Sequence, residues 1–388
     1  MKKKVLVGIS GGIDSAVTAA LLKTQGYDVF GLHLQFWPEN RKSFRVGGGR
    51  CCKASSVAEV KTLCEKLEIP FNCVDASEIY EDRVIDSLIH DYLSARKPNP
   101  CVLCNSFLKF DFLLEKADEL RCDYIATGHY AKALASRSGD GMSYLYKPVD
   151  TQQDQTYFLF GLSQKVLSRT LMPLGDLLQQ NVLKLAETFD LGFSKEDFEK
   201  QNLINICMIG EKGYKPIVEA SATDRFLHPG HIIDQQGKVF GRHDGLYRYY
   251  IGQSDNLNIA ASSSSQEGPV YFVVGFDIKL NALIIGKKED LWKSELIAKR
   301  PNWIGPIDFS KGLRVNAKIS AITPEASCTV TLMNNDSLVV RFDEPQHAIT
   351  PGQPIVFYQG EQVLGGAWIE SLLQPITTAA RSLKDLHA

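Results

Sequence analysis

The chain has 388 residues, 44% of them hydrophobic and 23% charged, which is enough for two or three domains with apolar cores. The net charge is −2 and the sequence pI about 6.5, so any RNA-binding surface must be a local basic patch. Glycines interrupt the basic and apolar start, and no apolar stretch is long enough to span a membrane. We expect a cytoplasmic protein without membrane contact.

Strands and helices alternate in the first third of the chain. Residues 4–10 form an apolar, β-branched run typical of a buried parallel strand, and 15–26 follow with helical spacing. The later elements predicted in this region are strands at 28–36, 70–77 and 123–128, and helices at 56–68, 80–97 and 106–120. This alternation predicts an α/β fold with a doubly wound parallel sheet.

The remainder of the chain has a different pattern. Residues 131–148 read as a hairpin, 157–200 mainly as helices, and strand signals dominate from about 205 onward. Short strands with turn residues between them, ending near residue 369, predict a small β-barrel. The expected units are an α/β domain at 1–205, a central β-rich domain at 206–285, a barrel at 286–372 and a polar tail at 373–388.

A glycine-rich loop, "GISGGIDSAV", joins the first predicted strand to the first helix. Gly11 and Gly12 allow a tight turn and close approach of a ligand, and amides at the helix start can bind an anion. Ser10 and Ser15 can donate to phosphate oxygens. Asp14 would repel a phosphate, so its place there suits a Mg²⁺ ligand or a helix cap.

This loop is neither a dinucleotide fingerprint nor a Walker loop, and it resembles the pyrophosphate loop of the ATP pyrophosphatase superfamily. The resemblance implies that the protein binds ATP with Mg²⁺, adenylates an oxygen and releases pyrophosphate. The nucleotide-binding residues that it implies in the loop are Gly8, Ile9, Ser10, Gly11, Gly12, Ile13, Asp14 and Ser15.

The chain has nine cysteines, an odd number that argues against a disulfide framework. We expect most of them to be small core residues, with exceptions in polar loops. Cys101 and Cys104 form a C-x-x-C pair in "NPCVLCN" that could bind zinc, act in redox chemistry or supply a nucleophile. Zinc would need a second ligand pair, and the close histidine pair, His228 and His231, belongs to a different predicted domain.

Four more segments narrow the choice: "NPCVLCN", "ATGHYAK", "DQTYFLF" and "ICMIG". Their order, with the loop ahead and "FDEPQHAITPGQPIVFY" behind, resembles the bacterial tRNA-specific 2-thiouridylases (the MnmA or TrmU family) from residue 4 to about 370. The resemblance implies adenylation of the 2-oxygen of a tRNA wobble uridine by ATP. A cysteine persulfide then supplies sulfur that arrives from a cysteine desulfurase or a sulfur-relay protein, yielding 2-thiouridine.

The resemblance also assigns site residues. Cys207 is implied as the persulfide carrier and Cys104 as the nucleophile, and the two would form a disulfide within the catalytic cycle. Leu34 and Gly128 match nucleotide-contacting positions. The residues implied to contact the tRNA are Asn99, Pro100, Cys101, His129, Gln153, Asp154, Gln155 and Gln353.

The chain departs from the family pattern at four places. Gln153 stands where the family usually has lysine, and the residues up to Cys207 read "NLINIC" where the family usually has "DSTGIC". Asp255 stands where a basic residue is expected, and residues 318–323 lack the Arg-Tyr-Arg cluster that the family usually has there. Fewer cations would weaken contacts with RNA phosphates. We therefore interpret the chain as a divergent paralogue with retained chemistry and altered RNA docking.

Three alternatives remain open. Cys101, Cys104 and Cys207 could hold a [4Fe-4S] cluster with one iron open for sulfur. The chain could instead be an RNA-binding relic with weak catalysis, or another ATP pyrophosphatase that has no use for the two cysteines. The tRNA species, the sulfur donor and the oligomeric state stay open.

Overall fold

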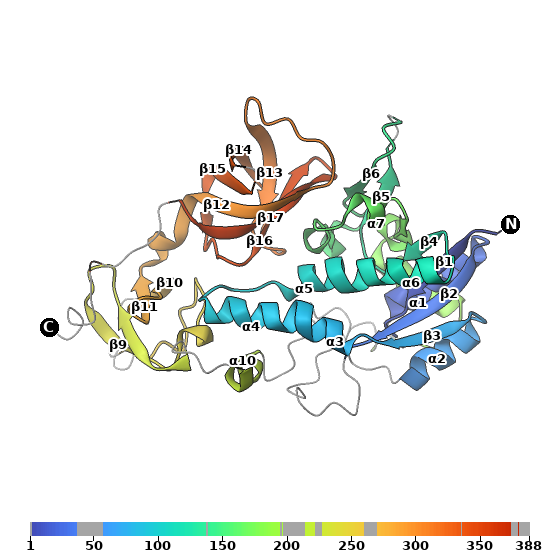
Figure 1. Ribbon diagram of the computed structural model, residues 1–388, viewed down its shortest axis with the longest axis horizontal. Coiled ribbons are helices and arrows are strands. Elements are labelled where there is room, and N and C mark those ends of the chain that lie inside the picture. The colour runs from blue at the N-terminus through green and yellow to red at the C-terminus, as the bar shows by residue number, and fades with distance from the viewer. Residues whose placement is uncertain are drawn as a thin grey trace.

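The computed structural model describes residues 2–36, 57–136, 139–194, 196, 214–221, 227–259, 270–334, 336–373 and 379. Three sheets organise these residues: a parallel sheet near the N-terminus, a small central sheet and a barrel (Figure 1). Two long helical runs lie side by side below the barrel, between the parallel sheet and the central sheet. Of the described helices, none combines the length and apolar character needed to cross a bilayer.

The N-terminal sheet has the strand order β3-β2-β1-β4-β7, and all four pairings are parallel. Its strands are β1 (Lys4–Gly8), β2 (Asp28–Gln35), β3 (Phe71–Asp75), β4 (Tyr124–Ala126) and β7 (Thr170–Leu171). The order reverses between β1 and β4, which makes the carboxyl ends of these two strands a switch point where α/β sheets bind ligands.

Helices cover both faces of this sheet, so the predicted doubly wound fold is confirmed. Val5 and Val7 of β1 pack in one core, whereas Leu6 faces a second core on the opposite side. The first core contains α1 (Ile13–Thr24), α2 (Val57–Lys66) and α8 (Gln179–Thr188), and the second contains α6 (Leu113–Glu119) and α7 (Gln164–Leu167).

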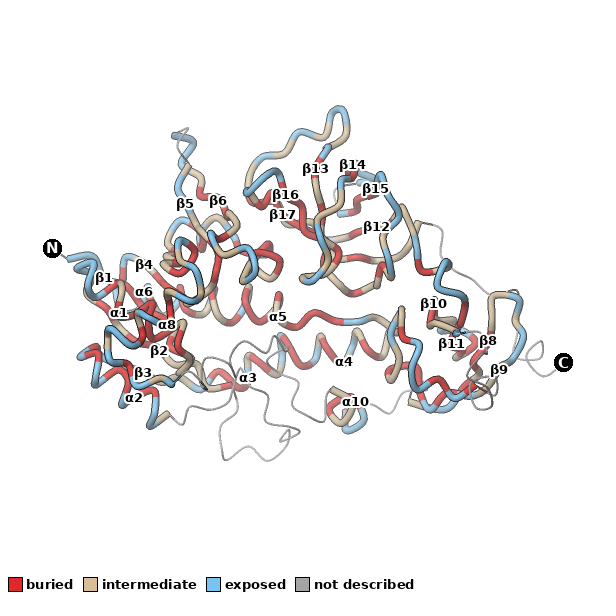
Figure 2. The backbone as a smooth tube through the Cα atoms, turned by 180° about the vertical axis from the view of Figure 1, so that it is seen from behind, coloured by how far each residue is buried: buried red, intermediate tan, exposed pale blue. Residues whose placement is uncertain are grey.

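The first long helical run joins α3 (Ser77–Tyr80), the π-helical η2 (Glu81–Ile85) and α4 (Asp86–Leu93). The second joins α5 (Pro100–Leu103), the π-helical η3 (Cys104–Phe112) and α6. Residues 98–100 and much of this second run are buried (Figure 2).

The second run corrects one prediction from the sequence, which began this helix at residue 106. It begins at Pro100, because proline at the first helical position has its φ preset and lacks an amide that would be unsatisfied there. Cys101 and Cys104 consequently lie on a helix and not in a polar loop.

The central sheet has the order β10-β11-β8-β9. Its strands are β8 (Gly230–Ile233), β9 (Val239–His243), β10 (Phe272–Asp277) and β11 (Ala282–Gly286). A helix, α10 (Lys215–Ser221), precedes it where the sequence favoured strands. Ile217 and Val218 of α10 are buried against Tyr92 and Leu88 of α4, so tertiary packing decides this element.

The barrel closes from six strands in the order β12-β15-β14-β13-β16-β17, with β12 pairing back to β17. The strands are β12 (Trp292–Trp303), β13 (Leu313–Lys318), β14 (Ala326–Asn334), β15 (Ser337–His347), β16 (Pro354–Gln359) and β17 (Gln362–Leu372). The sequence prediction omitted β12. Only Leu296 and Ala298 of its twelve residues are fully buried, so its hydrophobic signal is weak.

The predicted hairpin is confirmed as β5 (Lys132–Ala135) and β6 (Ser143–Tyr146), and it has a second role. Strand β6 pairs with β17 of the barrel, with Tyr146 opposite Gln362. The N-terminal domain and the barrel therefore share one continuous sheet. The domain limits expected from the sequence remain predictions.

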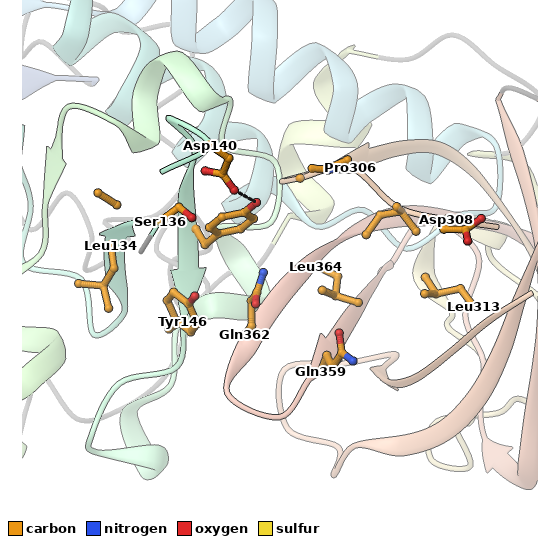
Figure 3. A pocket seen from close by; sticks show the side chains of 14 residues that line it. Leu134, Ser136, Asp140, Tyr146, Pro306, Asp308, Leu313, Gln359, Gln362 and Leu364 are labelled. Carbon is orange, nitrogen blue, oxygen red and sulfur yellow. Dashed lines mark hydrogen bonds between the residues drawn. The ribbon is translucent and has the colours of Figure 1, made fainter. Parts of the chain in front are cut away.

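A cavity of about 760 Å³ lies between this hairpin and the barrel. Tyr144 and Tyr146 line it from the hairpin, and Gln359 and Gln362 line it from the barrel (Figure 3). None of its lining residues belongs to the glycine-rich loop after β1, so the cavity is separate from the switch point.

Polar contacts fix the N-terminal domain against the barrel. The Tyr157 hydroxyl donates to the Pro354 carbonyl at 2.8 Å, and Asn302 Nδ2 donates to the Phe160 carbonyl at 2.6 Å. Arg96 pairs with Glu370 at 2.7 Å just before the second helical run. We call the boundary defined by these contacts the seam.

Tyr157→Phe tests the strength of the seam. Tyr157 is 1% exposed, and removal of its hydroxyl would leave the buried Pro354 carbonyl without the hydrogen bond that the hydroxyl donates. We expect the free energy of unfolding to fall by about 1–3 kcal/mol, measured from urea denaturation. The control Tyr144→Phe removes a hydroxyl bonded to exposed Asp140 and should change it by less than about 0.5 kcal/mol. Equal effects would contradict the account of the seam.

Candidate active site

The glycine-rich loop lies between β1 and α1, at the carboxyl end of the central strand. Gly11 has φ of 86°, a conformation that glycine adopts without strain. The Ser10 amide donates to Ser15 Oγ at 3.2 Å, and Ser15 Oγ donates to the Gly12 carbonyl at 2.9 Å. These bonds close the loop on itself ahead of a twelve-residue helix, an arrangement that favours anions.

Gly128 packs directly against this loop. A Cβ atom at Gly128 would lie 2.8 Å from the backbone carbon of Asp14 and 2.9 Å from the Ser15 amide nitrogen. Gly128 follows β4, so the two segments meet at the switch point between β1 and β4. The structure thus brings Gly128 against the glycine-rich loop, although Gly128 lies 113 positions after Ser15 in the sequence.

Tyr130 reaches the loop from the same segment. Its hydroxyl donates to Asp14 Oδ1 at 3.0 Å, and its ring is 1% exposed. Burial, with the Asp14 charge as a smaller cause, raises the pKa of Tyr130, so the phenol stays protonated as a donor. The sequence carries no local signal for the role of Tyr130, because a tyrosine after a strand resembles any core aromatic.

A magnesium ion that arrives with ATP needs only one or two protein carboxylates, and Asp14 can supply one. Tyr130 fixes the orientation of that carboxylate. Within the described residues, no three or more His, Cys, Asp or Glu side chains gather as a metal site.

Tyr130→Phe should weaken binding of ATP with Mg²⁺ roughly 10-fold, because Asp14 loses the hydrogen bond that orients it. Isothermal titration calorimetry measures the dissociation constant. Tyr124→Phe, at the opposite end of β4, is the matched control and should bind as wild type does. Unchanged binding by Tyr130→Phe would contradict a role for this contact.

The segment directly before the second helical run contacts the barrel. Asn99 Nδ2 donates to Gln353 Oε1 at 3.3 Å, and Gln353 Nε2 donates to the carbonyls of Lys97 at 2.8 Å and Pro98 at 3.0 Å. Two expected tRNA-contacting residues from distant parts of the chain therefore lie together. Asn99 Oδ1 is buried without a hydrogen-bond partner among the described residues.

Cys104 is 7% exposed at the start of η3 and packs with Tyr80 and Leu108, whereas Cys101 is half-buried one turn earlier. The spacing of three residues places both thiols on one side of the helix. The same run contacts the site further on: Leu113 lies 3.6 Å from the Cβ position of Gly8. Cys207 lies outside the described residues, so its pairing with Cys104 stays a prediction.

Other described cysteines have the character of core residues. Burial raises the pKa of the Cys64 thiol to about 11 and that of Cys328 to about 12. Burial also raises the pKa values of Cys73 and Cys122. Thiols of this kind are poor nucleophiles at neutral pH, as expected for structural cysteines.

The remaining expected residues lie near the switch point or the seam. His129 Nδ1 lies 2.9 Å from Thr127 Oγ1, and its ring packs beside Phe110 with centroids 5.4 Å apart. Gln155 Oε1 accepts from the Tyr130 amide at 2.9 Å. Leu34, at the end of β2, is partly buried between two cores.

Of the three-residue segment 153–155, Gln153 and Asp154 differ in exposure. Gln153 is half-buried at the end of a 3₁₀ turn, η4 (Thr151–Gln153). The Asp154 side chain is only 7% exposed and forms an ion pair with Lys318 of the barrel. Lys318 therefore supplies one cation in the segment 318–323, which lacks the Arg-Tyr-Arg cluster that the family usually has there.

Residues 3–211 match the family model described as tRNA methyl transferase HUP domain, 223–287 match its PRC-barrel domain, and 293–369 match an aminomethyltransferase beta-barrel domain. The fold and the loop thus define a HUP-domain nucleotide-binding protein with two appended β domains.

The relatives narrow this class. A tRNA-specific 2-thiouridylase MnmA from Clostridium perfringens is 38% identical over 96% of this chain and 99% of its own length. That from Geotalea uraniireducens is 38% identical over 98% of both chains. The chain belongs to the MnmA family of tRNA-specific 2-thiouridylases, as the sequence motifs predicted. Among solved structures, an NMN synthetase from Francisella tularensis covers 56% of this chain and 76% of its own at 16% identity, with a TM-score of 0.33, too distant to bear on the site.

Proposed function

We propose that this protein is an ATP-dependent tRNA-uridine 2-sulfurtransferase that converts the wobble uridine to 2-thiouridine. The observation that carries the proposal is the junction of the glycine-rich loop with Gly128 at the switch point, next to the helical run that bears Cys104. Membership of the 2-thiouridylase family supports it.

The loop would bind the phosphates of ATP through backbone amides at the start of α1. The Ser10 and Ser15 hydroxyls, which bond within the loop in this structure, would turn to donate to phosphate oxygens. The uracil 2-oxygen attacks the α-phosphorus, the bond to the β-phosphate oxygen breaks, and pyrophosphate leaves. Asp14 would hold a Mg²⁺ ion that arrives with ATP, and that ion would supply charge neutralisation at the phosphates. Asn99 Oδ1, buried without a described partner, can accept from an N–H group of the base.

The terminal sulfur of a Cys207 persulfide then attacks the activated C2 carbon, and AMP leaves with its bonding pair. The Cys104 thiolate attacks the Cys207 sulfur, which breaks the persulfide S–S bond and leaves sulfur on C2. The two cysteines end as a disulfide, and a dithiol reductant must restore both thiols. A cytoplasmic location and sulfur delivery by a desulfurase or relay protein belong to this proposal.

An iron–sulfur variant is a second candidate, favoured by one observation: Cys101 and Cys104 share one side of the helix. With Cys207, three thiolates would leave one iron of a [4Fe-4S] cluster open. Iron analysis of protein purified anaerobically separates the two candidates. Full thiolation activity without bound iron would exclude the cluster.

Exchange of labelled pyrophosphate into ATP, with and without tRNA, tests the proposed function. We expect exchange that depends on tRNA, because the adenylated base forms reversibly before sulfur arrives. An RNA-binding relic would bind tRNA without exchange, and exchange that ignores tRNA would indicate another ATP pyrophosphatase.

A further inference from the structure

A cluster of partly buried charges lies on the seam around Tyr358 of the barrel. Lys147 pairs with Glu325 at 2.5 Å, with side chains 12% and 19% exposed. Lys318 pairs with Asp154 at 3.4 Å, with side chains 15% and 7% exposed. Both ammonium groups lie over the Tyr358 ring, at 4.9 and 5.7 Å from its centroid. Each ion pair joins the N-terminal domain to the barrel.

The two ion pairs differ in the further hydrogen bonds that their members make. Lys147 follows the hairpin, and its ammonium also donates to the Gly360 carbonyl of the barrel at 3.0 Å. Asp154 faces inward: Oδ1 accepts from the Thr156 amide at 2.9 Å and the Thr156 hydroxyl at 2.6 Å, while Oδ2 faces Lys318. Both carboxylate oxygens of Asp154 are thus bonded within the protein.

Gln155, the residue after Asp154, is connected to the nucleotide site by hydrogen bonds. Gln155 Oε1 accepts from the Tyr130 amide at 2.9 Å, and the Gln155 amide donates to the Tyr130 carbonyl at 3.2 Å. Tyr130 in turn donates to Asp14 of the glycine-rich loop. A continuous series of bonded groups therefore runs from the end of β13 to Asp14.

Removing one member of an ion pair that is largely shielded from water leaves the other charge uncompensated and favours local rearrangement. Without Lys318, the Asp154 carboxylate would rotate toward solvent. This rotation would shift the adjacent backbone, which positions Gln155 against Tyr130. We propose that Lys318 is a positioning residue that couples the barrel to the ATP site by holding Asp154. This inference rests on the proposed function, since it concerns the adenylation step.

The test compares Lys318→Met with Lys147→Met. Both variants break a partly buried ion pair on the same seam and remove a cation from the same Tyr358 ring. Of the two lysines, Lys318 is the one bonded to Asp154. We expect Lys318→Met to raise KM for ATP in tRNA-dependent pyrophosphate exchange by roughly 2- to 30-fold. Lys147→Met should keep the wild-type KM, although both variants lower the melting temperature.

Two further variants keep the result interpretable if the seam is weakened. Lys318→Arg retains the charge and should restore KM, and Lys318→Met combined with Asp154→Asn removes both charges and should recover part of it. Equal KM values for Lys318→Met and Lys147→Met, beside an active wild type, would overturn the inference alone. A wild-type protein without tRNA-dependent exchange would overturn the proposed function and this inference with it.

Discussion

Replacing Gly128 with alanine should reduce pyrophosphate exchange by at least about 100-fold. The added Cβ would lie 2.8 Å from the Asp14 carbonyl carbon and 2.9 Å from the Ser15 nitrogen, closer than real Cβ atoms approach backbone. The glycine-rich loop or the segment after β4 must then move, and phosphate-binding amides lose their alignment. Steady-state exchange with saturating tRNA measures the effect.

Gly139→Ala is the control for this substitution. Gly139 lies on the hairpin turn, and no atom of the described residues is within 4 Å of its Cβ position, so the change strains only local backbone. It should leave exchange at the wild-type rate. If Gly128→Ala retained wild-type exchange while folded by circular dichroism, the loop would not be the nucleotide site.

Cys104→Ser should lower the rate of 2-thiouridine formation by at least about 1,000-fold, while adenylation continues. A serine hydroxyl has nearly the size of the thiol but does not ionise near neutral pH, and it cannot form a disulfide. The expected signature is intact tRNA-dependent pyrophosphate exchange without sulfur transfer. Mass spectrometry of nucleosides from tRNA incubated with ATP and a persulfide donor gives the readout.

Cys101→Ser is the matched control, one turn away on the same helix. The two-cysteine route predicts retained sulfur transfer in Cys101→Ser, whereas a three-thiolate cluster predicts its loss. If Cys104→Ser still formed 2-thiouridine at the wild-type rate, Cys104 would be a core residue, as its contacts with Tyr80 and Leu108 allow.

The sequence was most informative where local pattern and tertiary role coincide. Strand β1 is an apolar run that ends in glycine, and both of its faces are buried, so the parallel sheet was predictable. Strand β12 was not, because most of its residues are only partly buried or exposed. The pairing of β6 with β17 joins residues more than 200 positions apart and leaves no local signal.

The same limit applies to the site. Motifs gave the loop and Gly128, because glycine itself is the signal where a Cβ would meet backbone. Tyr130 and Lys318 carry no such signal, since a tyrosine or a lysine suits many surroundings. Only the folded contacts with Asp14 and Asp154 show what these two side chains do.

Nucleoside mass spectrometry of bulk tRNA tests the central claim most directly. The tRNA comes from a deletion strain that carries wild type, Cys104→Ser or Cys207→Ser. The account predicts wobble 2-thiouridine with wild type and none with either variant. Unchanged 2-thiouridine in the deletion strain, in a genome without a second copy, would contradict it.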